Sequence, residues 1–256
     1  MATVRIIGPG RAGSALALAL AATGWEVEAP YRRGDELATA AIGVDLCVIA
    51  TPDAAVAEVA AQLTPAPGTV VAHLAGSLGL DVLEPHPHRA SLHPLVSIPR
   101  PDVGAQRLRS GAWFAVAANA PGAERLVNQV VIDLGGRAIE VPDEARATYH
   151  AAACIASNHL VALLAQVERV AAGAGVPLEA YLDLVRGTVD NVEAMGTSGA
   201  LTGPVARGDE GTIQRHLAAI DPSERAGYAA MVAEARRLVD PSARLPWANG
   251  RSGRET

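Results

Sequence analysis

A glycine-rich segment near the start of the chain narrows the choice of folds more than any other part of it. Thr3–Ile7 is β-branched and apolar, and Gly8-Pro9-Gly10-Arg11-Ala12-Gly13 follows it in the pattern G-x-G-x-x-G. Ala12–Ala22 then has the composition of a helix. Glycines at these three places permit a tight turn, close approach of a ligand to the backbone and close packing of helix on strand. The segment therefore predicts a strand–turn–helix unit.

The first half of the 256-residue chain alternates short β-branched runs with segments rich in Ala and Leu. Nearly continuous apolar runs are typical of strands covered on both faces, so the alternation predicts a doubly wound parallel sheet. We expect strands at Thr3–Ile7, Trp25–Ala29, Asp45–Ala50, Thr69–His73, Ala90–Leu92, Ala112–Ala118 and Arg137–Val141, with helices at Ala12–Ala22, Asp53–Leu63 and Pro121–Leu134.

The pattern changes after Pro142 and becomes entirely helical. Residues 143–172 contain neither proline nor glycine and predict one long helix, and Pro177 opens another helix. Two more helices are expected at Asp209–Ile220 and Ser223–Leu238; Leu201–Asp209 predicts a loop, with Asp209 as the N-cap of the helix that follows. We therefore predict an α/β fold: an N-terminal Rossmann-type domain at 1–142, followed by an all-α substrate or dimerisation domain at 143–240. The remainder, 241–256, is rich in Pro, Arg and Gly and predicts a disordered tail.

Charge and residue usage exclude several classes of function. The net charge is −6, which argues against a nucleic-acid binder. All 21 basic residues are arginine, so Schiff-base chemistry, a Walker-type phosphate lysine and a lysine general acid are excluded. The two cysteines, Cys47 and Cys154, offer neither a disulfide framework nor a metal pair. Because every apolar run of 18 residues is interrupted and no signal segment is recognised, we expect a cytoplasmic protein that does not contact a membrane.

The glycine turn predicts a dinucleotide site. A helix that starts there presents free N–H groups and the positive end of its dipole to phosphates. Ligands of doubly wound sheets bind beyond the carboxyl ends of the strands, so the ends of the third and fourth strands are expected to border the same site. The predicted contacts are Gly8, Gly10, Arg11, Ala12, Gly13, Thr51, Pro52, His73 and Gly76. Asp53 is interpreted mainly as the N-cap of the next helix.

The end of the second strand selects between the two nicotinamide coenzymes. Glu28 has the spacing of an acid that binds the ribose 2′-hydroxyl of NAD. Arg32 and Arg33 follow the strand, and a guanidinium matches the 2′-phosphate of NADP. We favour NADP(H); the alternative is a solvated turn with ordinary surface arginines.

The long helix carries a polar stripe. At about 100° per residue, His150, Cys154, Ser157 and Asn158 fall within an arc of roughly 100°. The polar groups of such a stripe need hydrogen-bond partners, which a neighbouring helix, water or a ligand can provide. If the partner is a ligand, His150, Ser157 and Asn158 are catalytic candidates. Candidate contacts for a small anionic substrate are His93, Asn191, Thr202 and Arg207, although Arg207 equally suits a salt bridge with a neighbouring acid.

A metal site is not predicted. His86, His88 and His93 are close in sequence, but the first two are bracketed by proline and no carboxylate cluster or cysteine pair completes a site. His93 is better interpreted as part of the rim of a site or as a turn residue.

These motifs together resemble a Rossmann-like family, labelled by a domain of unknown function, that is related to the 6-phosphogluconate and β-hydroxyacid dehydrogenases. The resemblance rests on Gly8–Gly13, Thr51-Pro52-Asp53, His73–Gly76, His93-Pro94, Tyr149–Ala153, Ser157-Asn158 and Leu201–Asp209. It implies a helical C-terminal domain that often builds a dimer, and some relatives resemble an alternative type of ketopantoate reductase. The related dehydrogenases carry a lysine on the long helix as proton donor. This chain has none, so His150 is the expected substitute.

The leading hypothesis from the sequence is an NADPH-dependent reductase of a small 2-keto acid or similar carbonyl compound, with ketopantoate as the first substrate to test. Two alternatives remain. One is a dinucleotide-binding sensor or scaffold without catalysis, which the loss of lysine favours. The other is an imine reductase similar to the pyrroline-carboxylate reductases. A homodimer formed through the helical domain is expected.

Overall fold

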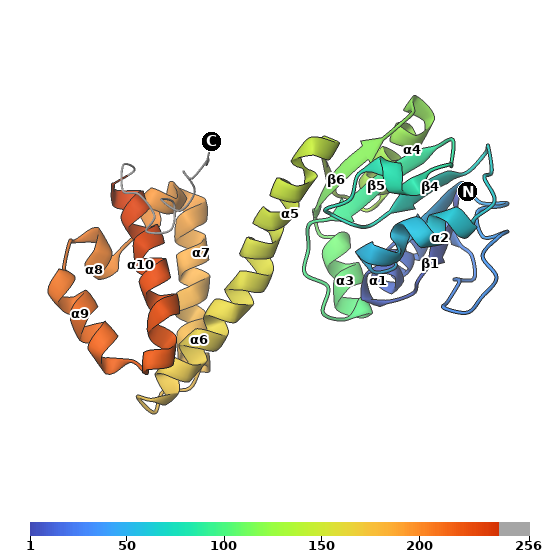
Figure 1. The fold of residues 1–256 in the computed structure, drawn as a ribbon. Coiled ribbons are helices and arrows are strands. Elements are labelled where there is room, and N and C mark those ends of the chain that lie inside the picture. Colours follow the sequence, from blue (N-terminus) through green and yellow to red (C-terminus); the bar gives the residue numbers. More distant parts are fainter. Residues whose placement is uncertain (241–256) are drawn as a thin grey trace, which may run out of the picture. The chain divides into compact units, whose positions relative to one another are not determined.

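The computed structural model describes residues 1–240 (Figure 1). The chain divides into two compact units, Met1–Ser157 and a second that begins at Asn158. This division falls later than the domain boundary expected at Pro142, because the first turns of the long helix belong to the sheet unit: Arg146 is buried there and donates to Ser91. The tail expected at 241–256 lies outside the described residues.

The first unit is built on a seven-stranded sheet. Its spatial order is β2-β1-β3-β4-β5-β6-β7, and the predicted doubly wound architecture is confirmed. Every predicted strand is present, with the bounds β1 Thr3–Ile7, β2 Glu26–Val27, β3 Leu46–Ile49, β4 Val70–His73, β5 Arg89–Pro94, β6 Trp113–Ala118 and β7 Arg137–Glu140.

One strand pair departs from the predicted parallel sheet. β5 and β6 are antiparallel, with Pro94 opposite Phe114. The chain leaves β5 and returns to the same edge of the sheet, where the N–H of Leu95 donates to the carbonyl of Trp113. The connection contains α3 (Pro101–Leu108), which was not predicted and which packs beside α1 (Arg11–Ala21). The other five strand pairs of this sheet are parallel.

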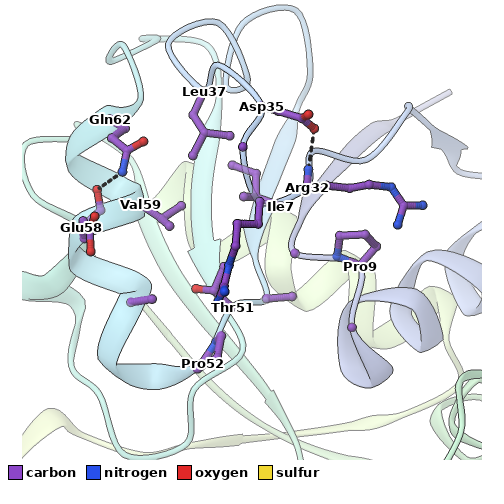
Figure 2. A pocket seen from close by; sticks show the side chains of 16 residues that line it. Ile7, Pro9, Arg32, Asp35, Leu37, Thr51, Pro52, Glu58, Val59 and Gln62 are labelled. Carbon is purple, nitrogen blue, oxygen red and sulfur yellow. Dashed lines mark hydrogen bonds between the residues drawn. The ribbon is translucent and has the colours of Figure 1, made fainter.

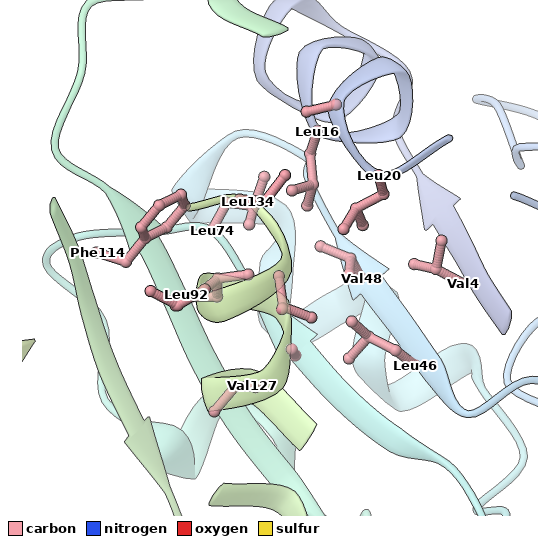
Figure 3. Packing of buried hydrophobic residues seen from close by; sticks show 14 of the residues in the cluster. Val4, Leu16, Leu20, Leu46, Val48, Leu74, Leu92, Phe114, Val127 and Leu134 are labelled. Atoms are coloured by element: carbon pink, nitrogen blue, oxygen red, sulfur yellow. The ribbon is translucent and has the colours of Figure 1, made fainter. Parts of the chain in front are cut away.

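Helices cover both faces of the sheet, as the apolar strands predict. On one face, Leu46 and Val48 of β3 pack with side chains of α1 and of α4 (Pro121–Asp133) (Figure 3). On the other face, Cys47 and Ile49 pack with α2 (Val56–Gln62). Burial raises the pKa of the Cys47 thiol to about 12, so this cysteine is a packing residue rather than a nucleophile.

The predicted long helix is present as one helical stretch, Asp143–Ala172. It runs through a 3₁₀ turn and α5 (Arg146–Cys154), a π-helical segment at Ile155–His159, and α6 (Leu160–Ala172). The π segment was not predicted; it changes the angular spacing of residues, so the calculated polar stripe does not continue regularly past Cys154.

The rest of the second unit is helical as predicted. It contains α7 (Glu179–Ala200), α8 (Gly203–Ala206), α9 (Glu210–Ala219) and α10 (Arg225–Val239). The short α8 lies where a loop was expected. Asp209 caps α9, as predicted, by accepting from the N–H of Thr212 at 2.9 Å.

The stretch Asp143–Ala172 is long and apolar enough, by length and composition, to cross a membrane, with a mean hydropathy of 1.3 in its most apolar window. An average over a window does not show the polar residues that interrupt the stretch. Core helices of water-soluble proteins pass the same criterion, although no residue of this window is buried. The criterion alone is therefore weak support for a membrane span.

Candidate functional site

The site lies at the edge of the sheet where the parallel strands β1, β3, β4 and β5 end. Residues Ile7, Ile49 and His73 are in register across β1, β3 and β4, and His73 lies opposite Ser91 of β5. The loops that follow these strands therefore converge on one edge, the position at which doubly wound sheets bind ligands.

The glycines of the first loop have the roles that the motif predicts. Gly8 has a φ of +87°, which favours glycine. A Cβ on Gly13 would lie 2.5 Å from the carbonyl oxygen of Gly8 and 2.9 Å from Ile6, so only glycine permits this packing of helix on strand. A Cβ on Gly10 would meet no atom within 4 Å, so the backbone here is open to a ligand.

A cavity of about 740 Å³ opens beside this turn (Figure 2). It lies between the glycine turn, the loop that carries Arg32 and Arg33, and α2. Six of the predicted contacts line it: Gly8, Gly10, Arg32, Arg33, Thr51 and Pro52. Other lining residues, among them Leu37, Glu58, Val59 and Gln62, were not predicted, because their sequence pattern marks only a loop and an amphipathic helix.

The arginine loop is fastened to the glycine turn by backbone hydrogen bonds. The N–H of Gly8 donates to the carbonyl of Tyr31 at 2.9 Å, and Tyr31 bridges to Ile7 beyond the end of β2. The carboxylate of Asp35 accepts from the N–H of Arg32 at 2.6 Å and holds the turn (Figure 2). Glu28 instead faces Arg5 at 3.7 Å and lines a separate, smaller cavity.

Three other predicted dinucleotide contacts, Arg11, Ala12 and Gly13, lie at the start of α1 and do not line the cavity. Gly13 is a packing position. His73 ends β4, and Gly76 lies in the loop after it. Both lie at a second group of side chains, which we call the histidine cluster: His73, His93, His150, Tyr149 and Arg146.

His73 is neutral and locked in one tautomer. Its Nδ1 accepts from the backbone N–H of Ala75 at 3.2 Å, so its Nε2 carries the proton and donates to the carbonyl of Gly79 at 3.1 Å. Burial lowers its pKa below the ordinary value, in agreement with the neutral form. Both ring nitrogens thus form hydrogen bonds within the protein. A role of His73 in binding a dinucleotide stays a prediction.

His93 lies between Tyr149 and His150. Its Nδ1 is 2.7 Å from the hydroxyl of Tyr149, and its ring meets the His150 ring edge-on at a centroid distance of 5.8 Å. A Cβ on Gly76 would lie 2.7 Å from the His150 ring and 2.9 Å from Nε2 of His93, so a glycine is required where the two rings converge. Burial, then the neighbouring His150 and Arg146, lower the pKa of His93 to about 4.

Arg146 is the buried cation of the cluster and is completely inaccessible to solvent. It donates to the hydroxyl of Ser91 and, at 3.1 Å, to the carboxylate of Asp143. The same carboxylate accepts from the N–H of Leu80 at 3.2 Å and so holds the loop after β4. Burial raises the pKa of Tyr149, and the charge of Arg146 offsets part of that increase, so the phenol is protonated near neutral pH.

A hydrogen bond joins the loops that flank the cavity and the cluster. Ser77 donates to Asp53 at 2.9 Å. Asp53 begins a short 3₁₀ turn and makes no capping hydrogen bond, so its interpretation as an N-cap was wrong. Its charge acts on both His73 and His93, which places the loop after β3 close to the cluster.

The remaining candidates lie at or beyond the boundary between the units. Ser157 and Asn158 are both in the π segment, a type of helix interruption often found at functional sites. In the second unit, Asn191 and Thr202 line a cavity of about 570 Å³ between α7 and the start of α8. Arg207 is exposed at the end of α8. Hydrogen bonds from Thr212 are the main cause of the lowered pKa of Asp209, and the charge of Arg207 adds a smaller contribution.

The histidines considered for a metal are not gathered into one site. His86 is buried, and its Nε2 donates to the carbonyl of Ala60 at 2.9 Å, whereas His93 contacts Tyr149 and His150. Within residues 1–240, no group of three or more His, Cys, Asp or Glu side chains is arranged to hold a metal ion.

Arg146 was not predicted as a site residue, and no role was predicted for Tyr149. Arg146 lies four residues before His150 and so shares its helix face, which is the one signal that marks it. Tyr149 is adjacent to His150 and off that face, so only its contact with His93, 56 residues away, reveals it.

Comparison with known proteins supports the fold. The family model of a domain of unknown function, DUF2520, matches residues 112–235. No curated protein matches the sequence. A candidate NADP oxidoreductase from Bacteroides fragilis superposes with a TM-score of 0.77 at 21% identity, covering 92% of this chain and 98% of that one. The fold is thus that of Rossmann-type proteins with a helical C-terminal region.

Two further solved structures share this fold. A Thermotoga maritima protein has a TM-score of 0.69 at 20% identity, covering 94% of this chain and 100% of that one. Pyrroline carboxylate reductase from Plasmodium falciparum, solved with NADP bound, has a TM-score of 0.62 at 14% identity, covering 93% and 98%. At these identities the likeness establishes the architecture and not the reaction.

The lowered pKa of His93 predicts a pH-dependent stability. Unfolded His93 takes up a proton near pH 6.5, whereas folded His93 does so only near pH 4. Its contribution to the free energy of unfolding is therefore complete above pH 6.5 and is lost as the pH falls toward 4. Urea unfolding between pH 7.5 and 5 should show a weaker loss of stability in His93→Asn than in the wild type. The exposed His159 provides the control, His159→Asn; identical pH slopes for wild type and His93→Asn would contradict the assignment.

Proposed function

We propose that this protein is an NADPH-dependent reductase of small carbonyl compounds, with 2-keto acids such as ketopantoate as the first class to test. The observation that supports this most is the pairing of two features on one sheet edge. A glycine turn borders a cavity of about 740 Å³, and the ends of the neighbouring strands carry His73 and His93, whose pKa values are lowered by burial; His93 also contacts the hydroxyl of Tyr149.

The residues at the glycine turn fit a phosphorylated dinucleotide. The open space at Gly10 suits a pyrophosphate, and the buried Oγ1 of Thr51 has no hydrogen-bond partner within the described residues. Arg32 and Arg33 line the cavity and suit a 2′-phosphate, whereas Glu28, the residue expected to favour NAD, does not line it. When bound, the dinucleotide supplies the hydride.

The protein's own residues have to supply orientation and a proton. We assign the acid role to His150, which takes the place of the missing lysine, and propose that Ser157 and Asn158 orient the carbonyl group. His93, Asn191, Thr202 and Arg207 are proposed substrate contacts, with Arg207 as the partner of the substrate's negative charge. The relation to the 6-phosphogluconate and β-hydroxyacid dehydrogenases is part of this proposal.

Reduction of an imine is a second candidate. It is favoured by the structural likeness to a pyrroline carboxylate reductase, whose substrate name denotes a cyclic imine. Carbonyl and imine reduction require the same hydride donor and the same proton, so the architecture serves both, and substrates of both kinds belong in the assay.

The coenzyme preference provides the first test. Replacing both Arg32 and Arg33 by serine should weaken NADPH binding by about 10- to 100-fold per lost charge-assisted contact and leave NADH binding nearly unchanged. Fluorescence titration with both coenzymes measures this. Arg109→Ser, at an exposed arginine outside the cavity, is the control. An equal loss for both coenzymes would refute the role of the two arginines.

The reaction provides the second test. NADPH absorbance is followed with ketopantoate, other 2-keto acids and pyrroline carboxylate, in wild type and His150→Ala. A reductase should lose about 10²-fold or more in rate on losing an acid–base group. A sensor or scaffold would bind NADPH equally well in both forms and turn over none of the compounds, and that result would refute the enzymatic proposal.

We also propose that the helical unit forms a homodimer. Of its described residues, only Ala171, Ile213 and Val232 are buried hydrophobics. Large apolar side chains of α6 and α7 are exposed instead, at Leu160, Val161, Leu163, Leu184, Val189, Val192 and Met195.

Sedimentation analysis should give a dimer of about twice 26.2 kDa. Val161→Asp places a charge on the exposed apolar surface and should dissociate the dimer. A wild-type monomer at micromolar concentration would contradict the proposal.

A further inference from the structure

The pair formed by Tyr149 and His93 differs from every other histidine contact of the cluster. His73 is held by a backbone N–H on one nitrogen and a backbone carbonyl on the other, so its tautomer cannot change. The partner of His93 is a hydroxyl, which both donates and accepts. His93 can therefore carry its proton on either nitrogen without losing this hydrogen bond.

The two nitrogens of His93 face different surroundings. Nδ1 is 2.7 Å from the Tyr149 hydroxyl. Nε2 lies against Gly76, where the edge of the His150 ring also comes within 3 Å of the position that a Cβ would occupy. The imidazole thus connects the phenol to the side on which His150 lies. All three residues are partly exposed, so the group is within reach of a ligand.

We propose that Tyr149 is the catalytic proton donor of the reduction and that His93 resupplies its proton. This proposal rests on the proposed function but gives the acid role to Tyr149 in place of His150. His150 then lies beside the nitrogen at which the proton enters the relay.

The transfer balances with the hydride that the reduced dinucleotide would supply when bound and one proton from solvent. As the hydride reaches the carbonyl or imine carbon, the π-electron pair moves to the oxygen or nitrogen, which takes the proton from the Tyr149 hydroxyl. The phenolate oxygen takes the proton from Nδ1 of His93, and Nε2 takes up the solvent proton. His93 is neutral before and after the step, and before the next turnover it returns to its first tautomer by proton exchange with solvent.

The charge environment suits a neutral relay. Arg146 is buried and faces the cluster, so a second cation on His93 is disfavoured, while the phenol is kept protonated by its burial. A neutral imidazole that exchanges one proton for another never has to hold a charge beside that guanidinium.

The chain contains a matched control for this pair. In the second unit, Nδ1 of His216 lies 2.7 Å from the hydroxyl of Tyr228, with the rings edge-on at 5.8 Å. Tyr149 and His93 have the same distance and a centroid separation of 5.5 Å. Tyr228→Phe therefore removes the same kind of hydrogen bond at a place that the proposal does not involve.

The experiment compares wild type, Tyr149→Phe, Tyr228→Phe and His93→Asn with NADPH and whichever keto acid or cyclic imine turns over. Tyr149→Phe should lose about 10²-fold or more in kcat, with NADPH affinity unchanged within about twofold, and Tyr228→Phe should match the wild type. In His93→Asn, the side-chain amide lies near the place of Nδ1, but no group takes the place of Nε2. A relay predicts a loss close to that of Tyr149→Phe, whereas nearly full activity would reduce His93 to a positioning residue and overturn the relay.

Nitrogen NMR of 15N-histidine protein gives a readout independent of turnover. Near neutral pH, His93 should be uncharged with both tautomers populated, and its Nδ1 signal should change in Tyr149→Phe but not in Tyr228→Phe. A cationic His93 or one fixed tautomer would overturn the relay. If the wild type turns over no substrate, the proposed function fails together with this inference; if it turns over and Tyr149→Phe is equally active, only the inference fails.

Discussion

The parallel register of β1, β3, β4 and β5 is the constraint on which the candidate site depends. Because Ile7, Ile49 and His73 lie side by side across three strands, the loops that follow them start at the same level of the sheet. The glycine turn, the Thr51–Pro52 loop and the His73–Gly76 loop are therefore neighbours without any long excursion of the chain. The close packing of Gly13 under Gly8 keeps the first of these loops tight against the sheet.

Arg146 connects this edge to the start of the long helix. Its guanidinium is fully buried, and burying an ion is unfavourable unless hydrogen bonds compensate for the lost water. Two of its nitrogens have acceptors, whereas Nη1 has none within the described residues. Ser91 of β5 and Asp143 accept from it, and Asp143 in turn holds the loop after β4 through the N–H of Leu80. One buried charge thus fixes the helix that carries Tyr149 and His150 against the strand end that carries His93. This explains why the first turns of the long helix belong to the sheet unit.

The sequence predicted what depends on neighbouring residues along the chain. Strand β1, the glycine turn and the cap at Asp209 follow from local pattern, and all three were confirmed. The antiparallel pairing of β5 and β6 depends on the edge of the sheet to which the chain returns. The residues of α3 show little apolar periodicity, and the helix is recognised only by its packing against α1. The contact of Arg146 with Ser91 joins residues 55 apart, and nothing in either segment specifies the other. For the same reason the sequence assigned no role to Tyr149, whose contact with His93 joins residues 56 apart.

The absence of lysine gives the cluster its chemical character. A lysine that donates a proton is cationic before the proton transfer and neutral after it. Its surroundings must therefore tolerate an ammonium ion. Here the buried guanidinium of Arg146 already provides a positive charge that cannot be removed, because arginine does not deprotonate in proteins. Groups that stay neutral, a phenol and an imidazole, are compatible with that fixed charge, and the depressed pKa values of His73 and His93 follow from burial beside it. In the reaction that we propose, neutral side chains therefore move the proton, while the fixed charge of Arg146 helps to keep both histidines neutral.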